Sequence, residues 1–219
     1  MSFDWHFCRF EVSFTRMTNR QSGSPDATEL PRIYLIRHGE TAWSRSGQHT
    51  GRTDLPLTPE GEAEARTLAG RLAGIRFDQV YSSPRQRAQR TCELAGLAAA
   101  MFIDPDLAEW DYGDYEGLRT EEIRANQPDW SIYRDGCPQG ESPADISARA
   151  DRLIVRLAGM SGTTAVFSHG HFGRVLAVRW IGWPVPAAAH LLIHTASLSL
   201  LTCEQNRGRP VIGLWNSVA

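Results

Sequence analysis

The chain has 219 residues, a net charge of −2 and 42% hydrophobic residues, values that are ordinary for one folded domain. Charges of both signs are mixed along the sequence, so neither nucleic acid nor an anionic membrane is an expected partner. All 23 basic residues are Arg, which excludes Schiff-base chemistry on Lys and any phosphate-binding loop that depends on Lys. An anion site in this chain must therefore be built from Arg, His and backbone N–H groups.

The N-terminal region is predicted to be an arm outside the fold. Residues 1–30 combine an aromatic segment with a polar, linker-like one, and are expected to be a flexible arm or, before Met17, a misassigned start. Residues 31–219 are expected to form a single domain. No segment has the pattern of a signal peptide or a membrane span. The four Cys residues have no metal-ligand or redox spacing, so reduced thiols and a cytoplasmic location are expected.

The first predicted strand is the apolar run that begins near Arg32 and is bounded by Pro31 and Gly39. Arg37 and His38 stand at its C-terminal end, where ligands bind in open α/β sheets. An Arg fork can donate two hydrogen bonds to a phosphate, and a neutral imidazole can act as base, metal ligand or nucleophile. A solvated turn is the alternative interpretation of the same pair.

The remaining chain alternates predicted helices and strands. Thr58-Pro59-Glu60 is typical of a helix start, with a capping hydroxyl followed by Pro and an acid. Further helices are predicted from Ser83-Pro84 and over Thr120–Ala125, Ser142–Ala158 and Phe172–Ile181, and further strands over Phe77–Tyr81, Thr163–Phe167, Ser197–Cys203 and Pro210–Trp215. His190 and His194 alternate with apolar residues and are predicted to lie in one more strand. The alternation favours an α/β three-layer sandwich, with a mostly parallel central sheet and helices on both faces.

Three of these strands end in the same kind of polar motif. Arg37-His38-Gly39 closes the first strand, the run from Ser82 to Arg87 follows the second, and Ser168-His169-Gly170 closes a third. Parallel strands place these ends at one edge of the sheet, so two Arg and two His are expected to converge on one anion site.

Arg37-His38-Gly39-Glu40-Thr41 and the later Thr50-Gly51-Arg52-Thr53-Asp54 resemble the histidine phosphatase superfamily, in the branch of cofactor-dependent phosphoglycerate mutases. Ser82-Ser83-Pro84, Arg87-Ala88, Glu109 and Ser168-His169-Gly170 match its later motifs in order, so the resemblance spans about residues 32–215. Segments 47–54 and 109–118 are most similar to bacterial acid phosphatases and fungal sedoheptulose bisphosphatases. The resemblance implies a phosphoglycerate mutase-like fold and a histidine acid phosphatase.

The same resemblance implies a role for each motif residue. His38 is expected to attack phosphorus and form a phosphohistidine, while Glu109 protonates the leaving oxygen and then activates water. The phosphate oxygens are expected to be held by Arg37, Arg87 and His169, with further donors from Gln48, Thr50 and Ser44. Ser44 stands where the mutases carry Asn, which leaves its contact open. Trp110 and Tyr112 either shape the substrate pocket or pack their own loop.

The motif set leaves three alternatives open: a phosphatase, a cofactor-dependent phosphoglycerate mutase and a non-catalytic phosphate-binding module. Mutases insert a basic segment after the Glu109 loop, whereas residues 118–133 carry few basic residues, which favours hydrolysis. His169 and His171 have the spacing of a metal pair without an Asp-rich partner motif, so we expect neither metal nor cofactor. The expected partner is a small phosphorylated substrate, a sugar phosphate or bisphosphate. The late strands are able to pair across a homodimer.

Overall fold

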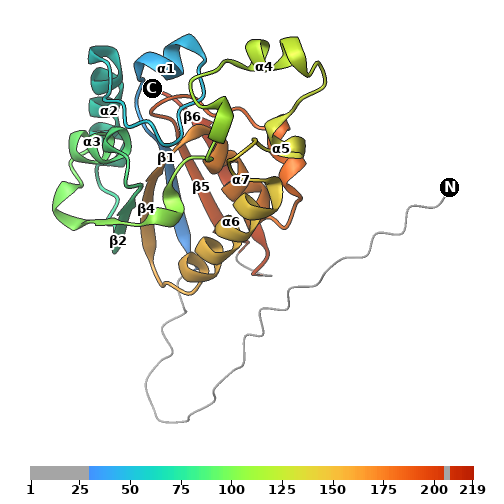
Figure 1. The fold of residues 1–219 in the computed structure, drawn as a ribbon. Coiled ribbons are helices and arrows are strands. Elements are labelled where there is room, and N and C mark those ends of the chain that lie inside the picture. The colour runs from blue at the N-terminus through green and yellow to red at the C-terminus, as the bar shows by residue number, and fades with distance from the viewer. Residues whose placement is uncertain (1–29, 205–207) are drawn as a thin grey trace, which may run out of the picture.

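The centre of the molecule is a six-stranded sheet with the order β3-β2-β4-β1-β5-β6 (Figure 1). The computed structural model describes residues 30–204 and 208–219. The strands are β1 (Arg32–Arg37), β2 (Gln79–Ser82), β3 (Met101–Ile103), β4 (Thr163–Ser168), β5 (Leu198–Cys203) and β6 (Pro210–Ser217). Strands β1 to β4 are mutually parallel, whereas β5 runs antiparallel to β1 and to β6. The prediction of a mostly parallel sheet is confirmed.

Helices cover both faces of the sheet, so the fold has three layers (Figure 1). Helices α2 (Pro59–Leu72) and α3 (Gln86–Leu94) pack on one face, and α6 (Pro143–Ala158) and α7 (Gly170–Trp180) pack on the other. Strand β1 contributes side chains to the hydrophobic core on both faces of the sheet, because successive side chains of a strand point to opposite faces. Its Ile33 and Leu35 join the core cluster beneath α6 and α7, and Tyr34 and Ile36 join the cluster beneath α2 and α3.

Several shorter elements carry the connections. These are the helices α1 (Ala42–Ser46), α4 (Thr120–Asn126) and α5 (Ile132–Asp135), and the 3₁₀ turns η1 (Ala98–Ala100), η2 (Pro105–Leu107), η3 (Gly113–Tyr115) and η4 (Val185–His190). The long helices start where their caps predict. The Thr58 hydroxyl accepts the Gly61 N–H at 3.0 Å, and the Ser142 hydroxyl accepts the Asp145 N–H at 3.2 Å.

The predicted strand through His190 and His194 is wrong. His190 ends η4, and residues 191–197 form a connection before β5. Pro184 and Pro186 lie at the start of this segment and lack the N–H groups that a central strand must donate. Strand β3 and helix α1 were not predicted, because each is too short for a periodic pattern to develop.

Nearly all of the predicted N-terminal arm, residues 1–29, lies outside the described residues. Within residues 30–204 and 208–219, no helix combines the length and the apolar character required to cross a bilayer.

Candidate active site

The three polar motifs meet at the C-terminal edge of the parallel strands. Arg37, the last residue of β1, is in register with Ser168, the last residue of β4. The next residue, His38, donates its N–H to the Ser168 carbonyl at 3.0 Å. Ser83, which follows β2, donates its N–H to the Phe167 carbonyl at 2.9 Å. Adjacent strands therefore bring the predicted Arg and His residues together, as the sequence predicts.

His38 is buried, and its hydrogen bond fixes the ring tautomer. Nδ1 lies 2.7 Å from the Gly39 carbonyl oxygen, which can only accept, so Nδ1 carries the proton. A neutral ring then leaves the lone pair on Nε2. Burial, followed by the charges of Arg87 and Arg37, holds the pKa of His38 well below its usual range. The imidazole is thus neutral at neutral pH, and its Nε2 lone pair is chemically able to act as a nucleophile.

His169 lies beside His38, with ring centroids 5.2 Å apart. Its Nδ1 accepts the Arg87 Nε–H at 3.3 Å, so its proton sits on Nε2, 2.7 Å from the Ser83 hydroxyl oxygen. Burial and the charge of Arg87 also keep the pKa of His169 well below its usual range. Ser83 therefore orients His169, a residue that the sequence predicts to bind phosphate. The sequence analysis named Ser83 only as part of its motif and gave it no role.

The two motif arginines both act on His38 through their charge, and each is held by backbone carbonyls. Arg37 Nη1 donates to the Ile193 carbonyl at 2.7 Å, and its buried Nε has no partner among the described residues. Arg87 donates Nη1 to the Thr53 carbonyl at 3.0 Å and Nη2 to the Thr50 carbonyl at 2.9 Å. Burial lowers the pKa of both, and the charge of Glu109 opposes this shift at each. Among the negative charges, Glu109 therefore has the largest effect on the pKa of both guanidinium groups.

The Glu109 carboxylate lies at the N-terminus of α7. Its Oε1 accepts the Phe172 N–H at 2.7 Å and its Oε2 accepts the His171 N–H at 3.0 Å. Because the first N–H groups of a helix have no partner within the helix, they form a ready site for a carboxylate. The bonds join Glu109 to the helix that follows His169.

Two further charged residues hold the Glu109 loop in place. Arg149 of α6 donates to the carbonyls of Ala108 at 2.7 Å and Glu109 at 3.2 Å. It also forms a two-point ion pair with Glu141, at 2.8 and 2.7 Å. Glu141 in turn accepts the Asp111 N–H at 2.9 Å. The sequence did contain a signal for Arg149, because it falls on the inward face of α6 together with Ile146, Ala150 and Leu153.

Three predicted phosphate donors have their side chains engaged in local bonds. Ser44 and Thr41 form a capping box at the start of α1. Gln48 donates Nε2 to the Gly117 carbonyl at 2.9 Å, and the Thr50 hydroxyl lies 3.3 Å from the Gln48 carbonyl oxygen. These bonds shape the loop around residues 48–53, to whose carbonyls Arg87 donates its hydrogen bonds.

Trp110 and Tyr112 are both buried, and they differ in what they touch. Trp110 has no exposed surface and donates its indole N–H to the Glu141 carbonyl at 2.9 Å, which places it in the packing of its own loop. The Tyr112 hydroxyl lies 2.7 Å from His171 Nδ1, next to the residues that bind Glu109. His49 stacks on the Tyr112 ring at a centroid distance of 4.7 Å.

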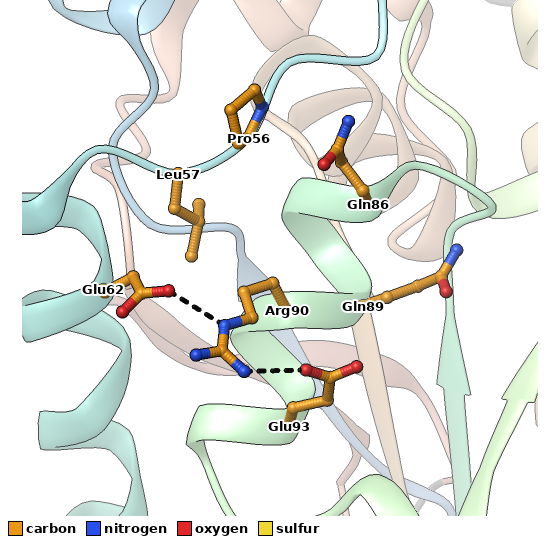
Figure 2. A pocket seen from close by; sticks show the side chains of 7 residues that line it. All are labelled: Pro56, Leu57, Glu62, Gln86, Gln89, Arg90 and Glu93. Atoms are coloured by element: carbon orange, nitrogen blue, oxygen red, sulfur yellow. Dashed lines mark hydrogen bonds and ion pairs between the residues drawn. The ribbon is translucent and has the colours of Figure 1, made fainter.

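A groove between α2 and α3 lies apart from these residues (Figure 2). Its central charge, Arg90, donates to Glu62 at 2.9 Å and to Glu93 at 3.0 Å, as Figure 2 shows. The groove contains no nucleophile and its cation is already neutralised, so it does not compete with the His38 site as a place for chemistry. Among residues 30–204 and 208–219, no three His, Cys, Asp or Glu side chains gather as a metal-ligand set.

A family model of the histidine phosphatase superfamily, branch 1, matches residues 33–217. The chain belongs to this superfamily. An acid phosphatase of Mycobacterium tuberculosis is 44% identical over 189 residues, covering 84% of this chain and 92% of the relative. A sedoheptulose 1,7-bisphosphatase of Saccharomyces cerevisiae is 38% identical over 184 residues, covering 69% of this chain and 68% of the relative.

The solved structures agree with this membership in the histidine phosphatase superfamily. The structure of an open reading frame product from Mycobacterium tuberculosis matches with a TM-score of 0.79 at 37% identity, covering 86% of this chain and 98% of that one. The family predicted from the motifs and its α/β fold are therefore confirmed.

Proposed function

We propose that the protein is a metal-independent phosphomonoesterase that hydrolyses a small phosphorylated metabolite, of the sugar phosphate class, through a phosphohistidine at His38. The observation that carries the proposal is the state of His38. Its Nδ1–H is engaged with the Gly39 carbonyl, its Nε2 therefore carries the lone pair, and the pKa of the ring is held well below its usual range. A neutral imidazole flanked by two guanidinium groups suits attack on a phosphate dianion.

The reaction proceeds in two balanced steps. His38 Nε2 bonds to phosphorus as the ester P–O bond breaks, and Glu109 gives its proton to the leaving alkoxide. Glu109 then takes a proton from water as the water oxygen bonds to phosphorus and the N–P bond breaks. Inorganic phosphate leaves and His38 is again neutral. Arg37 and Arg87 hold the phosphoryl oxygens throughout, and His169 joins them by turning its Nε2–H from the Ser83 hydroxyl to a phosphoryl oxygen. Residues 48–50 shape the loop beside them.

Hydrolysis is favoured over mutase chemistry by the segment after the Glu109 loop. Arg124, one of its few basic residues, donates Nε to the Trp130 carbonyl at 3.0 Å and so supports the chain between α4 and α5. We also propose a cytoplasmic location, supported by the scattered spacing of the Cys residues.

The proposal is tested by phosphate release from p-nitrophenyl phosphate in the presence of EDTA. The wild type is expected to turn over, and His38→Ala to lose at least about 1,000-fold in kcat, since it lacks the nucleophile. His190→Ala is the matched control, because His190 is exposed and lies in η4. Full activity in His38→Ala would refute the phosphohistidine, and isomerisation without phosphate release would indicate a mutase.

A further inference from the structure

A single peptide group connects His38 to helix α2. Its carbonyl, which belongs to Gly39, accepts the His38 Nδ1–H at 2.7 Å. Its N–H, which belongs to Glu40, donates to Oε2 of Glu64 at 2.9 Å. Because a trans peptide is planar, its oxygen and its hydrogen point in opposite directions. The ring of His38 and the carboxylate of Glu64 are therefore hydrogen-bonded to opposite ends of the same polar group.

The close approach of α2 explains how Glu64 reaches this peptide. Gly61 and Glu64 lie three residues apart in α2, and residues at that spacing are neighbours on a helix surface. A Cβ on Gly61 would collide with the backbone of Glu40, so the helix backbone and the loop after β1 are in contact. The half-buried Glu64 side chain, on the next turn, binds the Glu40 N–H directly.

The neighbouring backbone groups of this loop have neutral partners. The Gly39 N–H donates to the Thr91 hydroxyl at 3.0 Å, and the Glu40 carbonyl accepts the Thr58 N–H at 2.9 Å. The Glu40 N–H is instead bound by the carboxylate of Glu64. A charged acceptor forms a stronger hydrogen bond than a neutral one, and hydrogen bonds in series polarise one another. This carboxylate therefore makes the carbonyl of the same peptide a stronger acceptor for the imidazole N–H.

The ring of His38 requires such an acceptor when it reacts. If Nε2 bonds to phosphorus while Nδ1 keeps its proton, the ring becomes positively charged. Burial and then the charges of Arg87 and Arg37 lower the pKa of His38, whereas the hydrogen bond to Gly39 raises it. The charge of Glu64 also reaches the site, because it opposes the lowering of the Arg37 pKa that burial causes.

We propose that Glu64 is a positioning residue for the nucleophile: through the peptide between residues 39 and 40, its carboxylate orients the His38 ring and stabilises the positive charge that the ring carries once Nε2 is bonded to phosphorus. This inference rests on the proposed function and deepens it. No proton moves along this chain of bonds, since Nδ1 keeps its proton throughout. The arrangement is that of a carboxylate that orients a reactive imidazole, with one peptide group inserted between them.

The test removes first the charge and then the acceptor at position 64. Glu64→Gln keeps an oxygen that can accept the peptide N–H, and Glu64→Met keeps only a side chain of similar length. For p-nitrophenyl phosphate we expect kcat/KM per folded enzyme to fall about fivefold in Glu64→Gln and about 10- to 100-fold in Glu64→Met. Inorganic phosphate should inhibit both variants as strongly as the wild type, because Arg37 and Arg87 are unchanged.

Glu60→Gln is the matched control, because Glu60 is exposed one turn earlier in α2 and the substitution removes the same charge. A second readout needs no turnover: the NMR resonance of the His38 Nδ1 proton, assigned by its absence from His38→Ala. It should move upfield in Glu64→Gln, since a weaker hydrogen bond deshields the proton less, and should stay in place in Glu60→Gln.

Two results would show that Glu64 only supports the fold and would overturn the proposal. One is an equal loss of kcat/KM in Glu60→Gln and Glu64→Gln, and the other is inhibition by phosphate that weakens as much as kcat/KM falls. An unmoved His38 resonance in Glu64→Gln would overturn it as well. A wild type that releases no phosphate would instead refute the phosphatase itself, and a moved resonance would then still support the link between Glu64 and the ring.

Discussion

At the scale of single residues, the site depends on histidines that are kept neutral. His38, His169 and His171 all have pKa values well below the usual range, chiefly because of burial. Neutral rings can attack phosphorus or accept a hydrogen bond from Arg, and protonated rings can do neither. The same burial makes the fold sensitive to acid, because the unfolded chain binds protons at these sites more readily.

His49 offers a measurable case of this acid sensitivity. Burial lowers its pKa to about 4, and its Nε2 is buried without a partner among the described residues. In the unfolded state His49 takes up a proton below about pH 6.5, whereas in the folded state it does so only near the lowered pKa. The unfolding free energy therefore decreases as the pH is lowered through that window. His49→Phe keeps the stacking on Tyr112 and removes the titrating nitrogen.

We therefore expect His49→Phe to match or slightly exceed the wild type in unfolding free energy at pH 7. At pH 4 it should exceed the wild type by about 3 kcal/mol, the cost of the pKa difference. Urea denaturation at both pH values checks this. A constant difference between the variant and the wild type at the two pH values would show that His49 does not titrate in this window.

At the scale of elements, the position of Glu109, the proposed general acid, depends on a helix–loop contact. Arg149 links α6 to the backbone of the Glu109 loop, and its guanidinium carbon lies 4.4 Å from the centre of the Phe172 ring on α7. The Phe172 N–H in turn holds the Glu109 carboxylate. Arg149, held by its ion pair with Glu141, thus supports Glu109 both at its backbone and, through Phe172, at its carboxylate.

Removing this contact should impair proton donation more than phosphate binding. For Arg149→Met we expect kcat/KM to fall about 10- to 100-fold more for an alkyl phosphate, glycerol 3-phosphate, than for p-nitrophenyl phosphate, whose leaving group needs little protonation. Arg179→Met breaks a comparable pair between α6 and α7 away from Glu109 and should leave that ratio unchanged. An equal loss on both substrates would mean that Arg149 supports the fold alone.

At the scale of the whole molecule, two layers meet backbone to backbone at the catalytic edge. A Cβ on Gly61 of α2 would collide with the backbone of Glu40, and a Cβ on Gly39 would collide with the Gly61 carbonyl. Gly70 lies in the same helix with open space around it. The loop that carries His38 is therefore supported by α2 with no side chain between them.

This contact predicts opposite effects for two identical substitutions in α2. Gly61→Ala should lower the unfolding free energy by about 2 kcal/mol or more through overpacking, and should reduce turnover by displacing the loop after β1. Gly70→Ala should raise stability by about 0.5–1 kcal/mol, because Ala loses less backbone freedom in a helix. Denaturant unfolding of both variants measures these changes in unfolding free energy. A mild effect of Gly61→Ala would contradict the close approach of the α2 backbone to the backbone of residues 39–40.

Local patterns predicted most of the layered fold. The apolar alternation of β1, the cap at Thr58 and the inward stripe of α6 each depend on a few neighbouring residues, so they are legible without a tertiary structure. The segment around His190 was misassigned because alternating apolar residues suit a turn packed on α7 as well as a strand.

The sequence by itself determined the family, the order of the elements and the residue types at three strand ends, since these follow from motifs and periodicity along the chain. Which atoms meet follows from the three-dimensional packing alone: the tautomer of His38, the place of Glu109 at the N-terminus of α7 and the bonds of Arg149 to the Glu109 loop. Hydrogen bonds and charge effects depend on distances of a few ångströms between segments far apart in sequence. No local pattern encodes those distances.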